Sequence, residues 1–168
     1  ASDVNLSITI ATDADTSAIA SLRTSVAEHL TQQYGRGHWS SPVTEKSVLR
    51  GIKTSRVLVA RNDTGIIATL RLATKKPWAI DLTYFGAIPR AVYLHDMAVT
   101  PDMQRQGIGR HFLHEVIPLA RALPSNAIRL DAYDADAGAG VFYAKCGFRE
   151  VGRVIYRKTP LIYFELIL

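Results

Sequence analysis

The stretch that decides the fold runs from Leu94 to Arg110 and reads Leu-His-Asp-Met-Ala-Val-Thr-Pro-Asp-Met-Gln-Arg-Gln-Gly-Ile-Gly-Arg. Its apolar first part favours a strand, and Pro101 ends this strand because proline has no amide hydrogen to donate to a sheet. Two glycines, Gly107 and Gly109, then open a segment with helical spacing. We therefore predict a strand, a glycine-containing turn and a helix that begins near Gly107.

This turn has the composition of an anion-binding site. Glycine lets the backbone approach a ligand closely, and the first amides of a helix have no acceptor within it. The helix dipole is positive at the same end. Residues 103–114 hold two arginines, two histidines and no carboxylate. The pattern predicts a phosphate site, although the spacing alone also fits a glycine-rich helix start with no ligand.

Two common phosphate motifs do not match the turn. A nucleotide P-loop has the pattern Gly-x-x-x-x-Gly-Lys-Ser/Thr, which is absent from the chain. A Rossmann turn has a third glycine where this chain has Phe112, and it follows the first strand of its unit. Both classes of nucleotide-binding protein are therefore disfavoured.

Outward from this segment, strand and helix patterns alternate along all 168 residues without repeats or a linker. The predicted strands are 6–10, 57–60, 65–72, 91–99, 127–132, 148–156 and 161–168. The predicted helices are one through Ile19, Leu22, Val26 and Leu30, then 44–55, 107–123, and one that Asp136 caps and Gly147 ends. Pro118 is expected to kink the third helix or leave one carbonyl unpaired. The result is one domain, 1–168, of the α/β or α+β class, in which we expect 161–168 to be a buried strand.

The composition of the chain limits the kinds of ligand and partner that it can be expected to bind. The chain has 20 Lys and Arg against 15 Asp and Glu, and this formal charge of +5 favours anionic ligands. No basic stripe or nucleic-acid motif is present, no run of about 18 apolar residues exists, and the first seven residues lack a signal-peptide pattern. A single cysteine, Cys146, excludes an intrachain disulfide. We expect a cytoplasmic monomer or homodimer that binds neither nucleic acid nor membrane.

A second motif follows downstream: Asp136-x-x-Ala139-x-x-Phe142-Tyr143-x-Lys145-x-Gly147-Phe148. Together with Gln104-x-x-Gly107-x-Gly109 and the strand before it, this motif makes the chain resemble the GCN5-related N-acetyltransferase (GNAT) superfamily. The order of elements agrees along nearly the whole chain, and residues 91–150 carry the specific motifs. The resemblance implies the acyl-CoA N-acyltransferase fold, a mixed and mostly antiparallel sheet of six to seven strands with helices on both faces.

The same resemblance implies that acetyl-CoA is the acyl donor. The residues implied in holding it are Met97, Ala98, Val99, Gln104, Arg105, Gln106, Gly107, Ile108, Gly109, Arg110, Asp136 and Lys145. The amides from Gln106 to Arg110 would hold the pyrophosphate, and the backbone of Met97 and Val99 would pair with the pantetheine arm. Asp136 departs from the family's usual asparagine and adds a negative charge near the coenzyme.

Acyl transfer to an amine requires a neutral amine, a polarised carbonyl and a proton for the leaving thiolate. The resemblance implies Tyr143 as the general acid, because a phenol keeps its proton at neutral pH. For the general base we favour Asp96, with Asp131 and His95 as alternatives. Strand alternation puts His95 and Asp96 on opposite faces unless a bulge interrupts the strand.

The sequence does not identify the acceptor. Trp39, Trp78, Tyr84 and Phe85 fall in predicted loops, where they either line a pocket for a cationic amine or cover the core. Small amines, amino acids, antibiotics and protein N-termini all fit. The histidines show no metal-ligand spacing. Two other functions stay open: a non-catalytic acyl-CoA-binding module and a nucleic-acid-binding domain.

Overall fold

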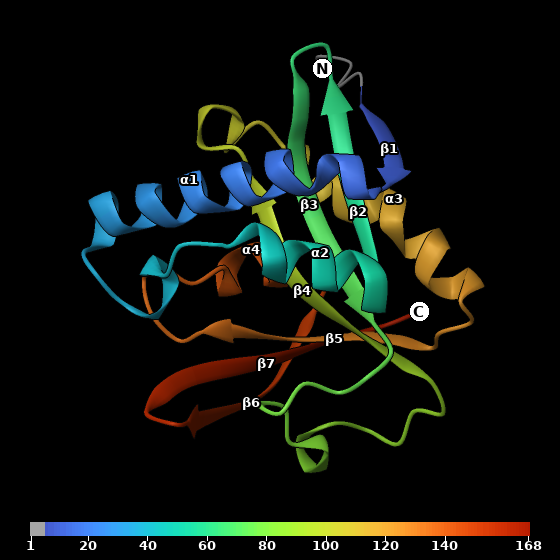
Figure 1. The fold of residues 1–168 in the computed structure, drawn as a ribbon. Helices are drawn as coiled ribbons and strands as arrows, with labels where there is room; N and C mark the ends of the chain where they lie inside the picture. Colours follow the sequence, from blue (N-terminus) through green and yellow to red (C-terminus); the bar gives the residue numbers. More distant parts are fainter. Residues whose placement is uncertain (1–5) are drawn as a thin grey trace. The chain divides into compact units, whose positions relative to one another are not determined.

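The computed structural model describes residues 6–168 (Figure 1). Residues 1–5, which carry part of the expectation about a signal peptide, lie outside the described residues. The strands are β1 (Ser7–Ile10), β2 (Arg56–Asn62), β3 (Gly65–Ala73), β4 (Ala91–Val99), β5 (Ala127–Tyr133), β6 (Arg149–Tyr156) and β7 (Thr159–Ile167). The helices are α1 (Thr16–Tyr34), α2 (Glu45–Thr54), α3 (Ile108–Ala122) and α4 (Gly140–Lys145). This order is the predicted one, and none of the helices described is long and apolar enough to cross a membrane.

The strands form a seven-stranded sheet in the order β1-β2-β3-β4-β5-β7-β6. Pairing is antiparallel between β1 and β2, β2 and β3, β5 and β7, and β6 and β7. Strand β4 pairs with β5 in parallel, over Ala91–Tyr93 opposite Ala127–Arg129. The predicted fold class, a mixed and mostly antiparallel sheet with helices, is confirmed.

The chain divides into two compact units. The first contains the residues up to Leu72 and His95–Glu115, and the second contains Ala73–Leu94 and Val116–Leu168. Strand β4 and helix α3 therefore each contribute residues to both units. That the whole chain is a single domain stays a prediction.

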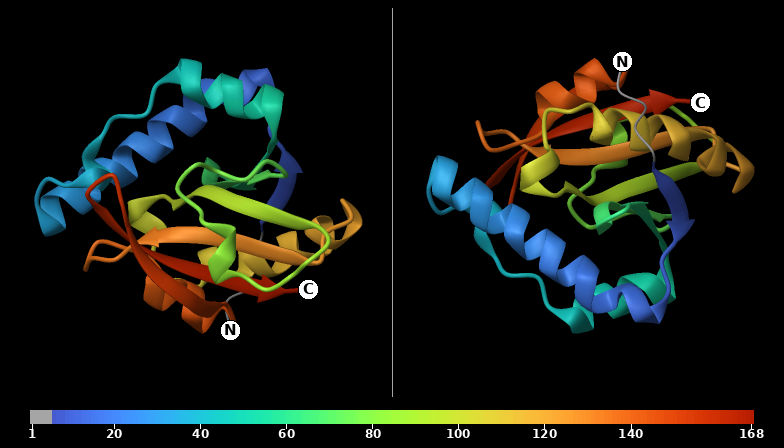
Figure 2. Two further views of the ribbon diagram at one scale, coloured as in Figure 1. Left: turned by 90° about the horizontal axis from the view of Figure 1, so that it is seen from below. Right: turned by 90° about the horizontal axis from the view of Figure 1, so that it is seen from above.

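In the first unit, α1 and α2 cover one face of β2 and β3, and the first turns of α3 lie on the other face (Figures 1 and 2). Alternate residues of β2, Val57 and Val59, pack with Ile19 of α1 and Val48 of α2, because alternate side chains of a strand share one face. Thr44 caps α2, since its side chain accepts a hydrogen bond from the amide of Ser47 in the first turn.

Helix α3 has the apolar face that its spacing predicts. Ile108, Phe112, Leu113, Val116 and Ala120 are all buried. The helix continues through its internal proline at position 118. A proline nitrogen donates no hydrogen bond, so the carbonyl four residues earlier lacks its usual helical partner.

In the second unit, β7 lies between β5 and β6, so the last strand is an interior strand with a buried core, as expected. On it, Glu165 faces Arg129 of β5 in register, and the two side chains form an ion pair of 2.7 Å while only 2% and 6% exposed. Arg129 also donates to the carbonyl of Gly86 at 2.8 Å and lies over the ring of Phe85. This buried pair therefore fixes part of the loop between β3 and β4 on the sheet.

The predicted start of α4 was wrong. The helix begins at Gly140, four residues after Asp136, which lies in a turn instead of capping the helix. The turn places Gly138 so close to the carbonyl oxygen of Tyr133 that a Cβ there would collide with it. This close approach is a long-range constraint that capping preference does not contain. The predicted end is confirmed, because Gly147 has a left-handed φ of 93°.

Candidate active site

Strand β4 changes its backbone conformation at Asp96. The φ of this residue is +56°, in the left-handed region that few residues other than glycine adopt. Three successive residues before it, 92–94, are buried, so the burial pattern of the strand does not alternate. Simple alternation therefore does not decide on which faces His95 and Asp96 lie.

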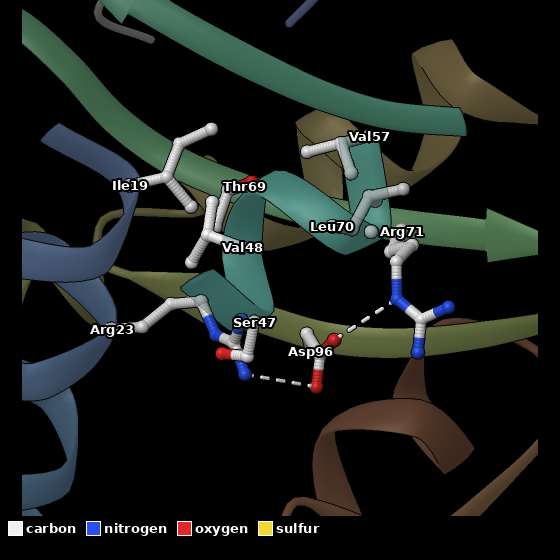
Figure 3. A pocket seen from close by; sticks show the side chains of 10 residues that line it. Ile19, Arg23, Ser47, Val48, Val57, Thr69, Leu70, Arg71 and Asp96 are labelled. Carbon is white, nitrogen blue, oxygen red and sulfur yellow. Dashed lines mark hydrogen bonds and ion pairs between the residues drawn. The ribbon is translucent and has the colours of Figure 1, made fainter. Parts of the chain in front are cut away.

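The carboxylate of Asp96 lies between two guanidinium groups (Figure 3). Nη2 of Arg23, on α1, is 3.1 Å from Oδ1, and Nε of Arg71, on β3, is 3.1 Å from Oδ2. The side chains of Arg23, Arg71 and Asp96 are 21%, 25% and 34% exposed, so water partly screens both ion pairs. We call these three side chains the arginine–aspartate cluster. Neither arginine was predicted as a site residue, because no local sequence pattern relates positions 23, 71 and 96.

A small cavity of about 20 Å³ lies beside the cluster (Figure 3). It is lined by the cluster together with Ile19, Ser47, Val48, Gly51, Val57, Thr69 and Leu70. Gly51 of α2 makes room for the stem of Arg71, since a Cβ at that position would be 3.1 Å from Cδ of the arginine. Nη1 of Arg71 also donates to Oγ of Ser55 at 3.3 Å. The position of Arg71 is thus set by α2 as well as by Asp96.

His95 adjoins the cluster and is half-buried. Burial lowers the pKa of His95 from its usual 6.5, the positive charge of Arg71 lowers it further, and Asp96 partly opposes both effects. The imidazole is therefore mostly uncharged at neutral pH and able to accept a proton. Within residues 6–168, no group of three or more His, Cys, Asp and Glu side chains is arranged to hold a metal ion.

The turn between β4 and α3 has the backbone that its glycine pattern predicts. Gly107 has a φ of +79°, and Arg105 is also left-handed, with a φ of +65°. The side-chain amide of Gln104 donates to the carbonyl of Val99 at 3.0 Å. This bond ties the start of the turn to the end of the strand.

The start of α3 offers a set of donors to an anion. The amide of His111 donates to the carbonyl of Gly107 at 3.0 Å, and the amides of 108–110 precede this first helical bond and have no acceptor within the helix. Arg105 precedes these amides in the chain, Arg110 carries the last of them, and both arginines are exposed. Amides at a helix start, with cationic side chains beside them, fit a phosphate group.

The residues of the second motif belong to the second unit. The ring of Tyr143 is 7% exposed and lies 5.6 Å and 6.1 Å, between centroids, from those of Phe148 and Phe164. Lys145 and Asp136 are exposed, and Asp136 lines an open groove of about 610 Å³ together with Phe164. Tyr143, Lys145 and Asp136 are thus in one unit, whereas Asp96 and the turn are in the other.

The four loop aromatics do not gather in one unit. Trp39 is in the first unit, and its indole N–H donates to a backbone carbonyl at 3.0 Å. In the second unit, Tyr84 and Phe85 each lie 5.4 Å from the buried ring of Tyr163, so both cover the core. Trp78 is 85% exposed beside an open groove.

Comparison with protein families gives a match to the model of the GNAT acetyltransferase domain over residues 53–150. Among curated proteins, the chain is 37% identical over 60 residues to glucosamine 6-phosphate N-acetyltransferase of Schizosaccharomyces pombe. That alignment covers 36% of this chain and 51% of the relative, so the chain spans about half the length of this relative.

Solved structures with the same fold cover almost the whole chain. Ribosomal-protein-alanine N-acetyltransferase from Brucella melitensis superposes with a TM-score of 0.72 at 19% identity, covering 96% of this chain and 99% of its own. The structure of yncA from Salmonella typhimurium with its cofactor acetyl-CoA gives 0.70 at 19% identity, covering 98% and 94%. At these identities the likeness shows the fold.

Proposed function

The chain belongs to the GNAT acetyltransferase family, and from that premise we propose that it transfers an acetyl group from acetyl-CoA to a primary amine. One observation carries the proposal: the turn at residues 104–110, between β4 and α3, presents unpaired amides of a kind that suits a phosphate group. The similar fold of yncA, with its cofactor acetyl-CoA, supports the same donor. Acetyl-CoA supplies the activated acyl group as a thioester.

We propose that the amides from Gln106 to Arg110 bind the pyrophosphate of the coenzyme. Gln104 keeps the turn on the end of β4, and Arg105 and Arg110 add positive charge. The backbone of β4 along Met97, Ala98 and Val99 is proposed to receive the pantetheine arm, and Asp136 and Lys145 are proposed contacts from the second unit.

The proposed chemistry needs no covalent intermediate on the protein. An amide near Met97 or Ala98 polarises the thioester carbonyl, as donors aimed at a developing negative charge do. The amine nitrogen forms the new C–N bond while the C–S bond breaks, and Tyr143 donates its phenolic proton to the departing sulfur. The proton that the nitrogen loses passes to Asp96, and solvent restores both residues.

Arg23 and Arg71 affect the route by which Asp96 receives that proton. Each of its carboxylate oxygens already pairs with one guanidinium group. The cavity beside it has room for one water molecule, and we propose that this water passes the proton on. His95, uncharged at neutral pH, is the alternative acceptor, so comparison of Asp96→Asn with His95→Asn would separate the two roles.

The experiment is a thiol-release assay with acetyl-CoA and a panel of amines. The panel contains amino acids, peptides with free N-termini, aminoglycosides and glucosamine 6-phosphate, the last taken from the name of the yeast relative. We expect release of free CoA that depends on one class of amine, together with the acetylated product. Binding of acetyl-CoA without release for any amine would point to a non-catalytic acyl-CoA module. Absence of binding would refute the assignment of the turn.

Location and assembly are also proposals. A chain with a single cysteine suits a reducing compartment, and we propose the cytoplasm. We propose a monomer or homodimer, which light scattering of the purified chain would decide.

A further inference from the structure

We propose that the arginine–aspartate cluster recognises an anionic group of the acceptor, so that the substrate is an amine that also carries a carboxylate or a phosphate. This inference rests on the proposed function, because it takes the cluster to border the place where the amine is acetylated. It concerns Arg23 and Arg71, which belong to neither of the two family motifs.

The cluster has more positive than negative charge. Two guanidinium groups face one carboxylate, which leaves a net charge of +1 at its three side chains. Each guanidinium has five N–H donors. In the contacts made by residues 6–168, Arg23 uses only Nη2, and Arg71 uses Nε and Nη1. Donors therefore remain on both arginines, in a fork geometry that suits carboxylate and phosphate oxygens.

The surroundings hold these donors in place and limit what reaches them. Arg71 is braced by Ser55 and by its fit against Gly51, and Ile19 and Val48 form an apolar wall of the cavity. The cavity of about 20 Å³ has room for about one water molecule, so a carboxylate or a phosphate group does not enter it. The anion would instead meet the remaining N–H groups of Arg23 and Arg71 where these two side chains are partly exposed.

The position of the cluster relates it to the reaction. Asp96 directly precedes Met97, whose backbone is proposed to lie along the acyl donor. The cluster thus places Asp96, the proposed proton acceptor, within a few ångströms of two positive groups that can bind an anion. Burial is the main cause of the lowered pKa of His95, and the positive charge of Arg71 lowers this pKa further. An amine that bears a nearby anionic group complements this arrangement.

The test measures binding of matched amines to the protein saturated with CoA, by calorimetry, so that turnover is not needed. Glycine is compared with glycinamide, and glucosamine 6-phosphate with glucosamine, because each pair differs in the anionic group and the two pairs separate carboxylate from phosphate. We expect the anionic member of at least one pair to bind about tenfold tighter or more, as charge-assisted hydrogen bonds to one group provide.

Arg23→Gln and Arg71→Gln should each reduce that preference about tenfold. Arg50→Gln is the control, because Arg50 is exposed on α2 outside the cluster and its loss changes the net charge equally. Unfolding midpoints and CoA affinity show whether each variant is folded. Equal binding within both pairs, no binding of any member, or a preference that survives both arginine variants would overturn the inference.

The same variants separate this inference from the proposed function. Thiol release with amines of either kind, without preference, would leave acetyl transfer standing and refute the anion site. Selective, arginine-dependent binding without thiol release would support the anion site and refute acetyl transfer.

Discussion

Replacement of Gly107 by alanine perturbs the turn at residues 104–110, the proposed coenzyme site, through its backbone alone. At a φ of +79°, an alanine costs about 1–2 kcal/mol relative to its preferred conformations. A Cβ at this position meets no atom within 4 Å, so no steric clash adds to this cost. The free energy of unfolding should therefore fall by about 1–2 kcal/mol.

Affinity for acetyl-CoA should fall more than this strain alone implies. An alanine that relaxes toward negative φ turns the amides of the next residues away from the pyrophosphate. The loss of one charge-assisted hydrogen bond costs about 1.5–3 kcal/mol, which corresponds to a rise in Kd of about 10- to 150-fold. Calorimetry with acetyl-CoA measures this change, and urea denaturation measures the stability.

Gly35 supplies a control. Its φ is also positive, at +83°, and a Cβ there meets no atom within 4 Å, but the residue ends α1 and lies outside the turn. Its ψ of 178° is in a region almost restricted to glycine, so Gly35→Ala should lower stability by at least as much as Gly107→Ala and leave the Kd for acetyl-CoA unchanged. Wild-type affinity in the Gly107→Ala variant, or an equal loss of affinity in both variants, would refute the assignment of the pyrophosphate to this turn.

Three further outcomes are expected. Tyr143→Phe keeps the buried ring but removes the proton donor, so kcat should fall about 100-fold or more while the Kd for acetyl-CoA stays constant. An unchanged kcat at saturating substrates would exclude Tyr143 as the general acid. The folded-state pKa of His95 is lowered, so the unfolded chain binds a proton at this residue before the folded chain does as the pH falls below about 6.5, and His95 destabilises the fold in acid. The His95→Asn variant should therefore lose less stability than wild type between about pH 7.5 and pH 5, as measured by urea titrations. Parallel pH profiles of stability for the two proteins would contradict this prediction. Glu165→Gln leaves the buried charge of Arg129 without its partner and should lower the free energy of unfolding by about 3–5 kcal/mol. The double variant Arg129→Met with Glu165→Leu should recover much of this lost stability. A loss below about 1 kcal/mol in Glu165→Gln would show that water reaches the ion pair.

Most of the fold was predictable because its signals are local. The alternation in β2 and the helical spacing in α3 depend on residues within a few positions of each other, and both elements form with the buried faces expected. Left-handed conformations at Gly107 and Gly147 also follow from the residue itself. The capping prediction for Asp136 failed because the chain before α4 is held by a contact between Gly138 and Tyr133 that capping preference does not describe.

Some residues of the candidate site were also predictable from local sequence, and others were not. The turn at residues 104–110 and its donors were evident from the sequence, because a glycine-containing helix start produces unpaired amides wherever it occurs. Whether Tyr143 and Asp96 act as proposed is a matter for the kinetic experiments. The sequence also left open how β4 presents Asp96, and the left-handed backbone at that residue is a property of the folded strand.

The order of elements, the glycine-containing turn at residues 104–110 and membership of an acetyltransferase family are determined by short-range sequence patterns, since backbone conformation depends mainly on neighbouring side chains. The ion pairs between residues far apart in the chain are not determined by such short-range patterns. Arg23 and Arg71 reach Asp96 from a helix and another strand, and Arg129 meets Glu165 through strand register. Electrostatic partners depend on distances of a few ångströms, and packing alone sets these between residues far apart in the chain.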